Sequence, residues 1–317
     1  TAVVIESIPG GPAQKCGVLA GDRLLMVDDV NIAGVHYPQD SMVRRMKGPA
    51  GTKVKVTVKR DGEVIPFEIT RGKIPMHSVD AAFMTSATDG YVRVSKFSRS
   101  TYEEFVKAIS GLRAQGMEHL VVDLRDNSGG YFDQALMMSN LFLPKDSLIV
   151  FLEGRKRARE DYRADGRGPY QDLPISLLIN EGSASSSEIF AGALQDNHRA
   201  TIVGRRSFGK GLVQEPINFT DGSGIRLTVA RFHTPSGRCI QKPYTEDYAF
   251  EVYKRYAGSE MVQKDSMKIE NGGIIPDVFV PLDTTRASDF YIKCNKKASA
   301  LRFASHYFDK HHTELSA

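Results

Sequence analysis

The sequence has little of what defines metal-stabilised, membrane-spanning or nucleic-acid-binding proteins. Only three of its 317 residues are cysteine, and they lie far apart without a CxxC pair. We therefore expect neither a zinc site nor a disulfide framework. No run approaches the roughly 18 consecutive apolar residues of a membrane span, so we expect none in this chain. With 42 basic and 38 acidic residues, a net charge of +4, the chain lacks the concentrated basic run that favours a nucleic-acid partner.

The remaining composition is that of an ordinary globular protein. Hydrophobic residues make up 41% of the chain and charged residues 25%, which excludes a disordered or fibrous protein. The length corresponds to about two domains, which can bury a core without metal or disulfide support. The chain begins with Thr1 and shows no signal-peptide pattern, so we expect that an N-terminal segment has been lost.

Residues 1–73 are predicted to form a small β-rich module. Short apolar strands are expected at 2–5 and 24–27, separated by a Pro- and Gly-rich stretch with one short helix. Valines that alternate with polar residues precede Asp61-Gly62, and alternation continues after it, which predicts a β-hairpin.

From about Tyr91 onward, strands and helices alternate. Helices are expected at 131–142 and 185–197, and a buried strand, HLVVDL, precedes the loop RDNSGG. The polar, Gly-bearing stretch 154–172 is predicted to be a surface loop, and the tail from 287 to 317 is helical in pattern. We therefore predict an α/β core, a mixed sheet with helices on its faces, preceded by the β-rich module.

The stretch from Asn180 to Gln214 carries the residues that point to chemistry. Its serine cluster, GSASSSE, lies between a predicted strand and a predicted helix. Backbone N–H groups and the helix dipole stabilise developing negative charge at such a position, which would favour a nucleophilic serine. Ser185 and Glu188 also fit a capping box, which on this feature alone is the more ordinary interpretation.

Lys210, in the segment SFGKG, is a candidate base for such a serine. A lysine accepts a proton only when its amine is neutral, and burial among apolar neighbours favours that form. Gln214 lies four residues further on and could orient the amine without adding charge. The alternative is a surface lysine in a glycine turn. Isolated histidines are more often structural, so we assign no catalytic role to His198 or His233.

Three rival motifs overlap this region and fail on residue type. The segment from Gly204 to Lys210 matches the front of a phosphate-binding P-loop, but Gly211 stands where a Ser or Thr should contact Mg²⁺. Ser207-x-x-Lys210 matches the tetrad of penicillin-binding enzymes, yet the glycines beside the lysine disfavour the required helix. A Ser-His-Asp hydrolase would normally show G-x-S-x-G, which the serine cluster does not match.

Together, these motifs resemble those of the carboxyl-terminal processing (tail-specific) serine peptidases. PGGPAQKCGVLAGDRLLMVDD is similar to the PDZ module of that family. The segments similar to its protease domain follow in the family order: YVRVSKFS, VVDLRDNSGG, NEGSASSSEIFAGALQD, VGRRSFGKGLVQ, TPSGRCIQ and GGIIPDV. The resemblance implies a PDZ-like domain at 1–73 that lacks its N-terminal part, a serine peptidase domain at 74–282 and a helical C-terminal extension at 283–317.

The resemblance further implies a serine–lysine dyad that cuts peptide bonds without a metal or cofactor. The residues it assigns are Ser185 as nucleophile, Lys210 as base, Gln214 as the supporting residue, and Gly130 and Ser186 as backbone N–H donors of the oxyanion hole.

The implied partners are polypeptide substrates, recognised through their C-termini in the PDZ groove. The family's carboxylate-binding loop and first PDZ strand are not in the sequence, so this recognition is inherited from the family alone. An extracytoplasmic location, periplasmic or secreted, is also implied.

Three alternatives stay open. Ser183 and Ser187 are alternative nucleophiles, because they belong to the same cluster. The whole chain could be a non-catalytic peptide- or ligand-binding protein on the same fold. The aromatic residues of the C-terminal tail make it a candidate surface for homo-oligomer formation.

Overall fold

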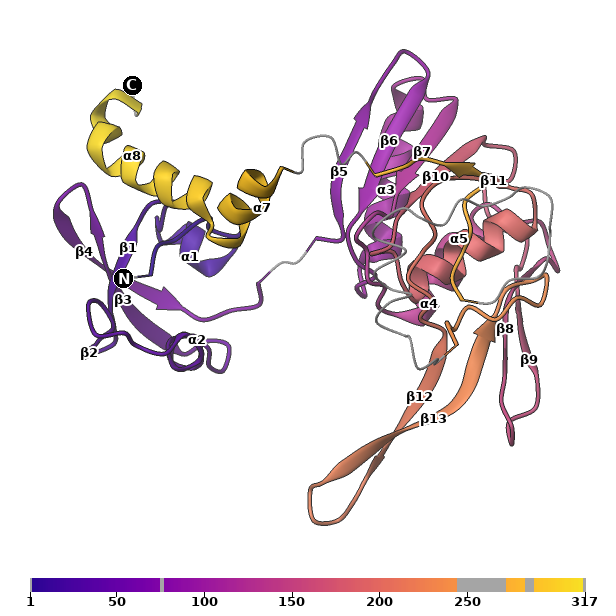
Figure 1. Ribbon diagram of the computed structural model, residues 1–317, viewed down its shortest axis with the longest axis horizontal. Coiled ribbons are helices and arrows are strands. Elements are labelled where there is room, and N and C mark those ends of the chain that lie inside the picture. The colour runs from indigo at the N-terminus through magenta and orange to yellow at the C-terminus, as the bar shows by residue number, and fades with distance from the viewer. Residues whose placement is uncertain (1, 75–76, 244–271, 283–287, 316–317) are drawn as a thin grey trace. The chain divides into compact units, whose positions relative to one another are not determined.

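The computed structural model describes residues 2–74, 77–243, 272–282 and 288–315. The chain divides into two compact units, one made of residues 1–76 with 284–317 and the other of residues 77–283 (Figure 1). The C-terminal helices therefore belong to the same unit as the N-terminal module.

The first unit is built on a four-stranded antiparallel sheet in the order β2-β1-β3-β4. Its strands are β1 (Arg23–Val27), β2 (Val30–Asn31), β3 (Lys53–Arg60) and β4 (Glu63–Thr70). The predicted hairpin is confirmed: Asp61 and Gly62 join β3 to β4 with φ of 55° and 88°, as a tight turn between twisted strands requires. The strand expected at 2–5 is reduced to a single bridge between Val3 and Arg23.

In its described residues, the first unit also contains four helices: α1 (Pro12–Lys15), α2 (Gln39–Met46), α7 (Asp289–Lys296) and α8 (Ser299–Leu315). The last two confirm the helical pattern of the tail. The core is formed by apolar side chains of the sheet and its loops, namely Leu24, Val27, Ile32, Val54, Val56 and Val58. Helix α8 lies close to this module, because a Cβ at Gly21 would be only 3.0 Å from the ring of Phe308.

The second unit contains a six-stranded sheet in the order β14-β11-β10-β7-β6-β5. Its strands are β5 (Val79–Met84), β6 (Asp89–Val94), β7 (His119–Asp123), β10 (Ile175–Ile179), β11 (Ala200–Gly204) and β14 (Val278–Phe279). Only β5 pairs antiparallel to its neighbour, and the other pairs are parallel. This confirms the predicted mixed sheet.

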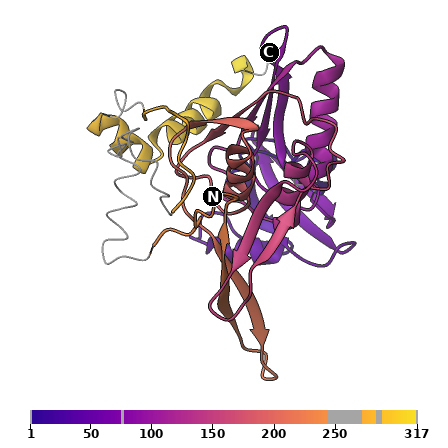
Figure 2. The ribbon, with the colours of Figure 1, turned by 90° about the vertical axis from the view of Figure 1, so that its right-hand side faces the viewer.

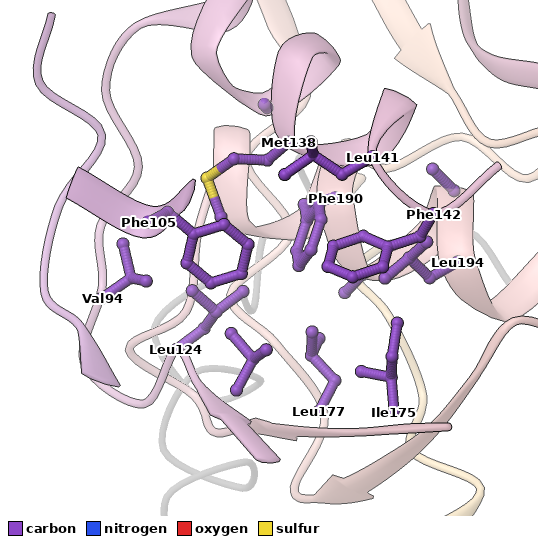
Figure 3. Packing of buried hydrophobic residues seen from close by; sticks show 14 of the residues in the cluster. Val94, Phe105, Leu124, Met138, Leu141, Phe142, Ile175, Leu177, Phe190 and Leu194 are labelled. Carbon is purple, nitrogen blue, oxygen red and sulfur yellow. The ribbon is translucent and has the colours of Figure 1, made fainter. Parts of the chain in front are cut away.

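Among the described residues, helices α3 (Thr101–Ala114) and α5 (Ser186–Asp196) pack with this sheet, and α4 (Phe132–Asn140) packs against these two helices. Phe105, Phe142 and Phe190 meet between them, with ring centroids 6.2–6.5 Å apart (Figure 3). All three rings are buried. Because Phe190 belongs to α5, this aromatic packing fixes the helix whose N-terminus follows the serine cluster.

A separate antiparallel sheet follows the order β12-β13-β8-β9. Its strands are β8 (Leu148–Glu153), β9 (Glu160–Arg163), β12 (Leu212–Asn218) and β13 (Gly224–His233). The hairpin of β12 and β13 projects from its unit in both views (Figures 1 and 2). The prediction that 154–172 is a surface loop is partly wrong. The polar segment β9 pairs with β8, and this tertiary pairing overrides its weak strand pattern.

Candidate active site

Helix α5 begins directly after Ser185, whose backbone has φ of 56° and ψ of −115°. Positive φ is uncommon outside glycine, and such strained backbones gather at functional sites. Ser185 is partly exposed and lies at a helix N-terminus, where the helix dipole favours negative charge. The position therefore suits a nucleophilic hydroxyl.

The two alternative serines are placed differently. Ser183 and Ser187 are fully buried. The Ser183 hydroxyl donates to the carbonyl oxygen of Leu124 at 2.7 Å, and the Ser187 hydroxyl donates to that of Asn127 at 2.9 Å. Both hydroxyls hold backbone segments together, which leaves Ser185 as the accessible serine of the three.

Glu188, in the first turn of α5, has a fully buried carboxylate. One oxygen accepts hydrogen bonds from the N–H groups of Ser185 (2.8 Å) and Lys210 (2.9 Å). The other accepts from the Ser207 hydroxyl (2.5 Å) and the Gly209 N–H (2.6 Å). Burial raises the pKa of Glu188, while these hydrogen bonds act in the opposite direction. The carboxylate joins the serine to the loop that carries the lysine.

The capping box predicted from Ser185 and Glu188 is present in the structure, and Glu188 has a second role beyond it. The N–H of Ser185 does donate to the Glu188 carboxylate, as in a capping box. The same carboxylate also accepts hydrogen bonds from the backbone N–H groups of Gly209 and Lys210, which lie in a distant loop. The spacing between Ser185 and Glu188 in the sequence carries no information about these bonds. This second role of Glu188 was not predicted from the sequence.

The structure leaves the side chains of Lys210 and Gln214 exposed. Gln214 Nε2 lies 3.5 Å from Thr228 Oγ1. Among the residues described, no hydrogen bond joins Lys210 to the Ser185 hydroxyl. Burial of the amine, which the chemical argument for a neutral lysine requires, is therefore not seen for Lys210 in this structure.

Gly130 and Ser186, the expected N–H donors, lie in segments that touch. The Ser186 hydroxyl donates to the Gly130 carbonyl at 3.0 Å. A Cβ at Gly129 would lie 2.7 Å from Ser185 Cβ and 2.9 Å from the Ser186 nitrogen. Only glycine allows this approach, and Gly129 also has φ of 93°. The loop of residues 125–130, called the glycine loop below, therefore lies directly against the start of α5.

An ion pair between a buried Asp and an exposed Arg lies at the start of the glycine loop. Asp123, at the end of β7, is fully buried and accepts hydrogen bonds from Arg125 (2.6 Å) and the Tyr91 hydroxyl (2.6 Å). Burial alone would raise the pKa of Asp123, but the hydrogen bonds from Arg125 and Tyr91 outweigh it and lower that pKa. No role was predicted for this pair from the sequence, although the segment VVDLRD, with an Asp and an Arg at the end of a buried strand, was the available signal.

The rival motifs fail in the structure as well. The segment of residues 205–211 has no helix, and strand β12 follows it. A P-loop needs a helix N-terminus for its phosphates, and the penicillin-binding tetrad needs its serine and lysine on one helix. Neither context is present in this part of the described chain.

Metal and membrane features can be assessed for the described residues alone. These ranges bring together no group of three or more His, Cys, Asp or Glu side chains that could hold a metal ion. Nor does any helix within them combine the length and the apolar character needed to cross a membrane.

Comparison with known families gives two matches along the chain. The model of peptidase family S41 matches residues 89–250, which is about half of the sequence, and the model of the PDZ domain matches residues 3–60. The first match contains the serine cluster, the lysine loop and the glycine loop described above.

Two similar proteins illustrate the extent of the likeness. The carboxyl-terminal-processing protease of Synechocystis sp. is 38% identical over 244 residues, covering 75% of this chain and 56% of that protein. The carboxy-terminal-processing protease of Bartonella bacilliformis is 40% identical over 246 residues, covering 75% of this chain and 55% of that protein. The chain spans about half the length of these relatives.

Solved structures agree with these matches. A photosystem II D1 C-terminal processing protease is similar at 30% identity with a TM-score of 0.52, covering 88% of this chain and 67% of that one. A putative S41 protease from Bacteroides fragilis has 16% identity and a TM-score of 0.50, with 90% and 73% covered, and this likeness concerns the fold alone. The resemblance seen in the motifs and the predicted fold class are confirmed.

Proposed function

The chain belongs to peptidase family S41, and from this premise we propose that it is a serine endopeptidase that hydrolyses peptide bonds in polypeptide substrates. The observation that carries the proposal is Ser185, partly exposed and strained at the N-terminus of α5, tied through Glu188 to the loop of Lys210. A binding surface alone would not need this connection.

The proposed reaction begins when the Ser185 hydroxyl attacks the carbonyl carbon of the substrate and its proton passes to the neutral amine of Lys210. The backbone N–H groups of Gly130 and Ser186 stabilise the negative oxygen of the tetrahedral intermediate. The protonated lysine then donates to the leaving amine, and an acyl-enzyme remains. Water, deprotonated by the same lysine, releases the acid product and restores Ser185.

Lys210 must turn toward Ser185 for this reaction, because its side chain is exposed in the structure. We propose that this turn is a side-chain rotation, because the backbone N–H groups of Gly209 and Lys210 are held by Glu188. Gln214 is proposed to orient the amine once it has turned. The proposed chemistry uses no metal or cofactor.

The PDZ-like part is proposed to bind substrate C-termini or to control access to the active site. The names of similar proteins, which refer to carboxyl-terminal processing, support this substrate class. We also propose an extracytoplasmic location, periplasmic or secreted, which fractionation of cells that express the natural gene would test.

Homo-oligomer formation through the C-terminal helices is a further part of the proposal. Phe290 and Phe303 have exposed fractions of 77% and 69%, which is unusual for such large apolar side chains. Sedimentation of the full chain beside Phe290→Ser/Phe303→Ser tests this, and an unchanged mass would reject a role for these residues.

The deciding experiment is hydrolysis of a denatured protein by wild type, Ser185→Ala and Lys210→Ala. We expect both variants to lose activity by about a thousandfold or more, with circular dichroism unchanged. Lys107→Ala, an exposed lysine on α3, is the matched control and should keep full activity. Full activity of Ser185→Ala would overturn the proposal.

The second candidate function is a non-catalytic peptide-binding protein, and the exposed position of Lys210 favours it. A serine-directed phosphonylating probe separates the two. Mass spectrometry should find the adduct on Ser185 of wild type and lose it in Lys210→Ala. Peptide binding without hydrolysis or adduct formation would favour the binding protein.

A further inference from the structure

The second unit carries a groove of about 910 Å³ between the turn after β8 and the β12–β13 hairpin. Three exposed basic side chains, Arg155, Lys156 and Arg231, line it. None of them forms an ion pair with any residue that the structure describes. Because these three side chains line one groove and form no ion pairs, their positive charge attracts a negatively charged ligand.

The acidic residues of the groove do not cancel this charge. Four basic and two acidic side chains line the space. Glu215 is already paired with Arg157 at 2.7 Å. Glu153 is the register partner of Arg231 on the neighbouring strand, so it offsets part of that charge and leaves Arg155 and Lys156 as the excess.

His233 lies on the same wall of the groove. Its ring stacks on Phe151 with centroids 4.8 Å apart, and its Nδ1 is buried without a hydrogen-bond partner among the residues described. Burial lowers the pKa of His233, which keeps the ring neutral near pH 7. Because this nitrogen is covered, a ligand in the groove would contact the basic side chains and not His233 Nδ1, and the ring adds no charge to the groove.

The groove is connected to the candidate active site by strand β12. Thr228 lines the groove and lies 3.5 Å from Gln214 Nε2. Glu215, which also lines it, directly follows Gln214 in the strand. A polypeptide that leaves the active site along this strand would pass the basic side chains.

We propose that this groove binds an acidic segment of the polypeptide substrate. The identity of the ligand as a substrate rests on the proposed function, whereas the binding itself does not. Asp and Glu carboxylates match the N–H donors of Arg155, Lys156 and Arg231. A nucleic acid is disfavoured because the lining includes no Phe, Tyr or Trp on which bases could stack.

The test uses the full chain with Ser185→Ala, so that binding is measured without turnover. Fluorescence anisotropy compares two labelled peptides that are identical except that three adjacent Glu residues in one are Gln in the other. We expect the acidic peptide to bind about tenfold more tightly at low salt, with a smaller preference at high salt. Equal affinities at low salt would overturn the proposal.

Matched charge variants locate the effect. Arg155→Gln/Lys156→Gln should abolish the preference, while Lys107→Gln/Lys145→Gln, which removes two exposed charges of the same unit elsewhere, should keep it. A preference that survives the first double variant would overturn the proposal. A second result would also overturn it: the chain binds a single-stranded oligonucleotide, Arg155→Gln/Lys156→Gln weakens that binding, and the two peptides bind with equal affinity.

His233→Phe tests the buried nitrogen, because phenylalanine keeps the stacking on Phe151 and removes the unpaired atom. We expect the acidic preference to be unchanged, because the neutral ring supplies no charge, while the melting temperature holds or rises. Hydrolysis by wild type is measured separately. Selective binding of the acidic peptide without any hydrolysis would contradict the proposed function and leave the groove assignment unchanged. Hydrolysis of both peptides at equal rates and with equal affinities would support the proposed function and contradict the groove assignment.

Discussion

Ser185 and Lys210 donate their backbone N–H groups to the same carboxylate oxygen of Glu188, at 2.8 and 2.9 Å. The relationship fixes the two backbones to each other, although the Lys210 side chain is exposed. The buried carboxylate thus acts as a positioning group, because it holds the segment of the proposed nucleophile and the segment of the proposed base without touching the reacting atoms.

Replacement of the Glu188 carboxylate by an amide should weaken the connection between the backbones of Ser185 and Lys210. Glu188→Gln presents an NH₂ group to N–H and O–H donors, so at least one hydrogen bond is lost. We expect kcat to fall by about a hundredfold with a smaller change in KM, and stability to fall by about 2 kcal/mol. Peptide hydrolysis and urea unfolding measure the two effects.

Glu104→Gln is the matched control. One oxygen of Glu104 also accepts two backbone N–H groups, from Ser78 and Val79, and the other accepts the hydroxyl of Ser100. This control should lose stability and keep kcat. A similar loss of kcat in both variants would show that Glu188 acts through general stability only.

The alternative serines should behave as structural residues. Ser183→Ala removes a buried hydroxyl that donates to Leu124 and accepts from the N–H of Asn180, so stability should fall by about 1–3 kcal/mol. Activity per folded molecule should stay within about tenfold of wild type, unlike that of Ser185→Ala. If Ser183→Ala were as inactive as Ser185→Ala at full folding, the nucleophile assignment would need revision.

The contact of the glycine loop with α5 makes a separate prediction. Gly129→Ala places a methyl group 2.7 Å from Ser185 Cβ, so the loop and the helix must separate. We expect a loss of more than about 2 kcal/mol and most of the activity. Gly116→Ala has a similar φ of 97° but its nearest neighbour is 3.8 Å away, so it should cost only about 1 kcal/mol and keep kcat. Equal kcat in both variants would reject the proposed role of the contact.

Local signals explain what could be predicted from the sequence. The hairpin at Asp61-Gly62 was predictable because two residues carry the whole turn geometry. Strand β9 was not, because it is polar and owes its pairing to the neighbouring strand β8. Its stability therefore depends on tertiary contacts that no short pattern contains.

Some features of the candidate site were likewise predictable from the sequence, and others were not. The resemblance pointed to Ser185, and the structure adds its exposure and its strained backbone. The hydrogen bonds from Gly209 and Lys210 to Glu188 join segments that are distant in sequence, and residue spacing carries no information about them. The chemical argument for a neutral lysine required burial of Lys210, whereas its side chain is exposed in the structure; burial depends on tertiary packing, which the spacing of residues in this segment does not determine.

The Asp123–Arg125 pair makes stability depend on pH. Because hydrogen bonds from Arg125 and Tyr91 hold the pKa of Asp123 below its ordinary value of 3.8, the unfolded chain takes up the proton more readily than the folded chain. The stabilisation is therefore complete above about pH 4 and is lost as the pH falls through the folded-state pKa. Asp123→Asn should be about 1–2 kcal/mol less stable at pH 7, a modest figure because the Arg125 side chain is 48% exposed.

Urea unfolding of wild type and Asp123→Asn at pH 7, 5 and 3 checks this dependence. The difference in the free energy of unfolding between the two should shrink from pH 5 to pH 3, since the variant has no carboxyl group to protonate at this position. Asp161→Asn is the control, because Asp161 also faces two arginines but lies on the surface, and its stability should follow wild type closely. A difference between wild type and Asp123→Asn that stays constant down to pH 3 would mean that Asp123 is held by packing and not by its charge.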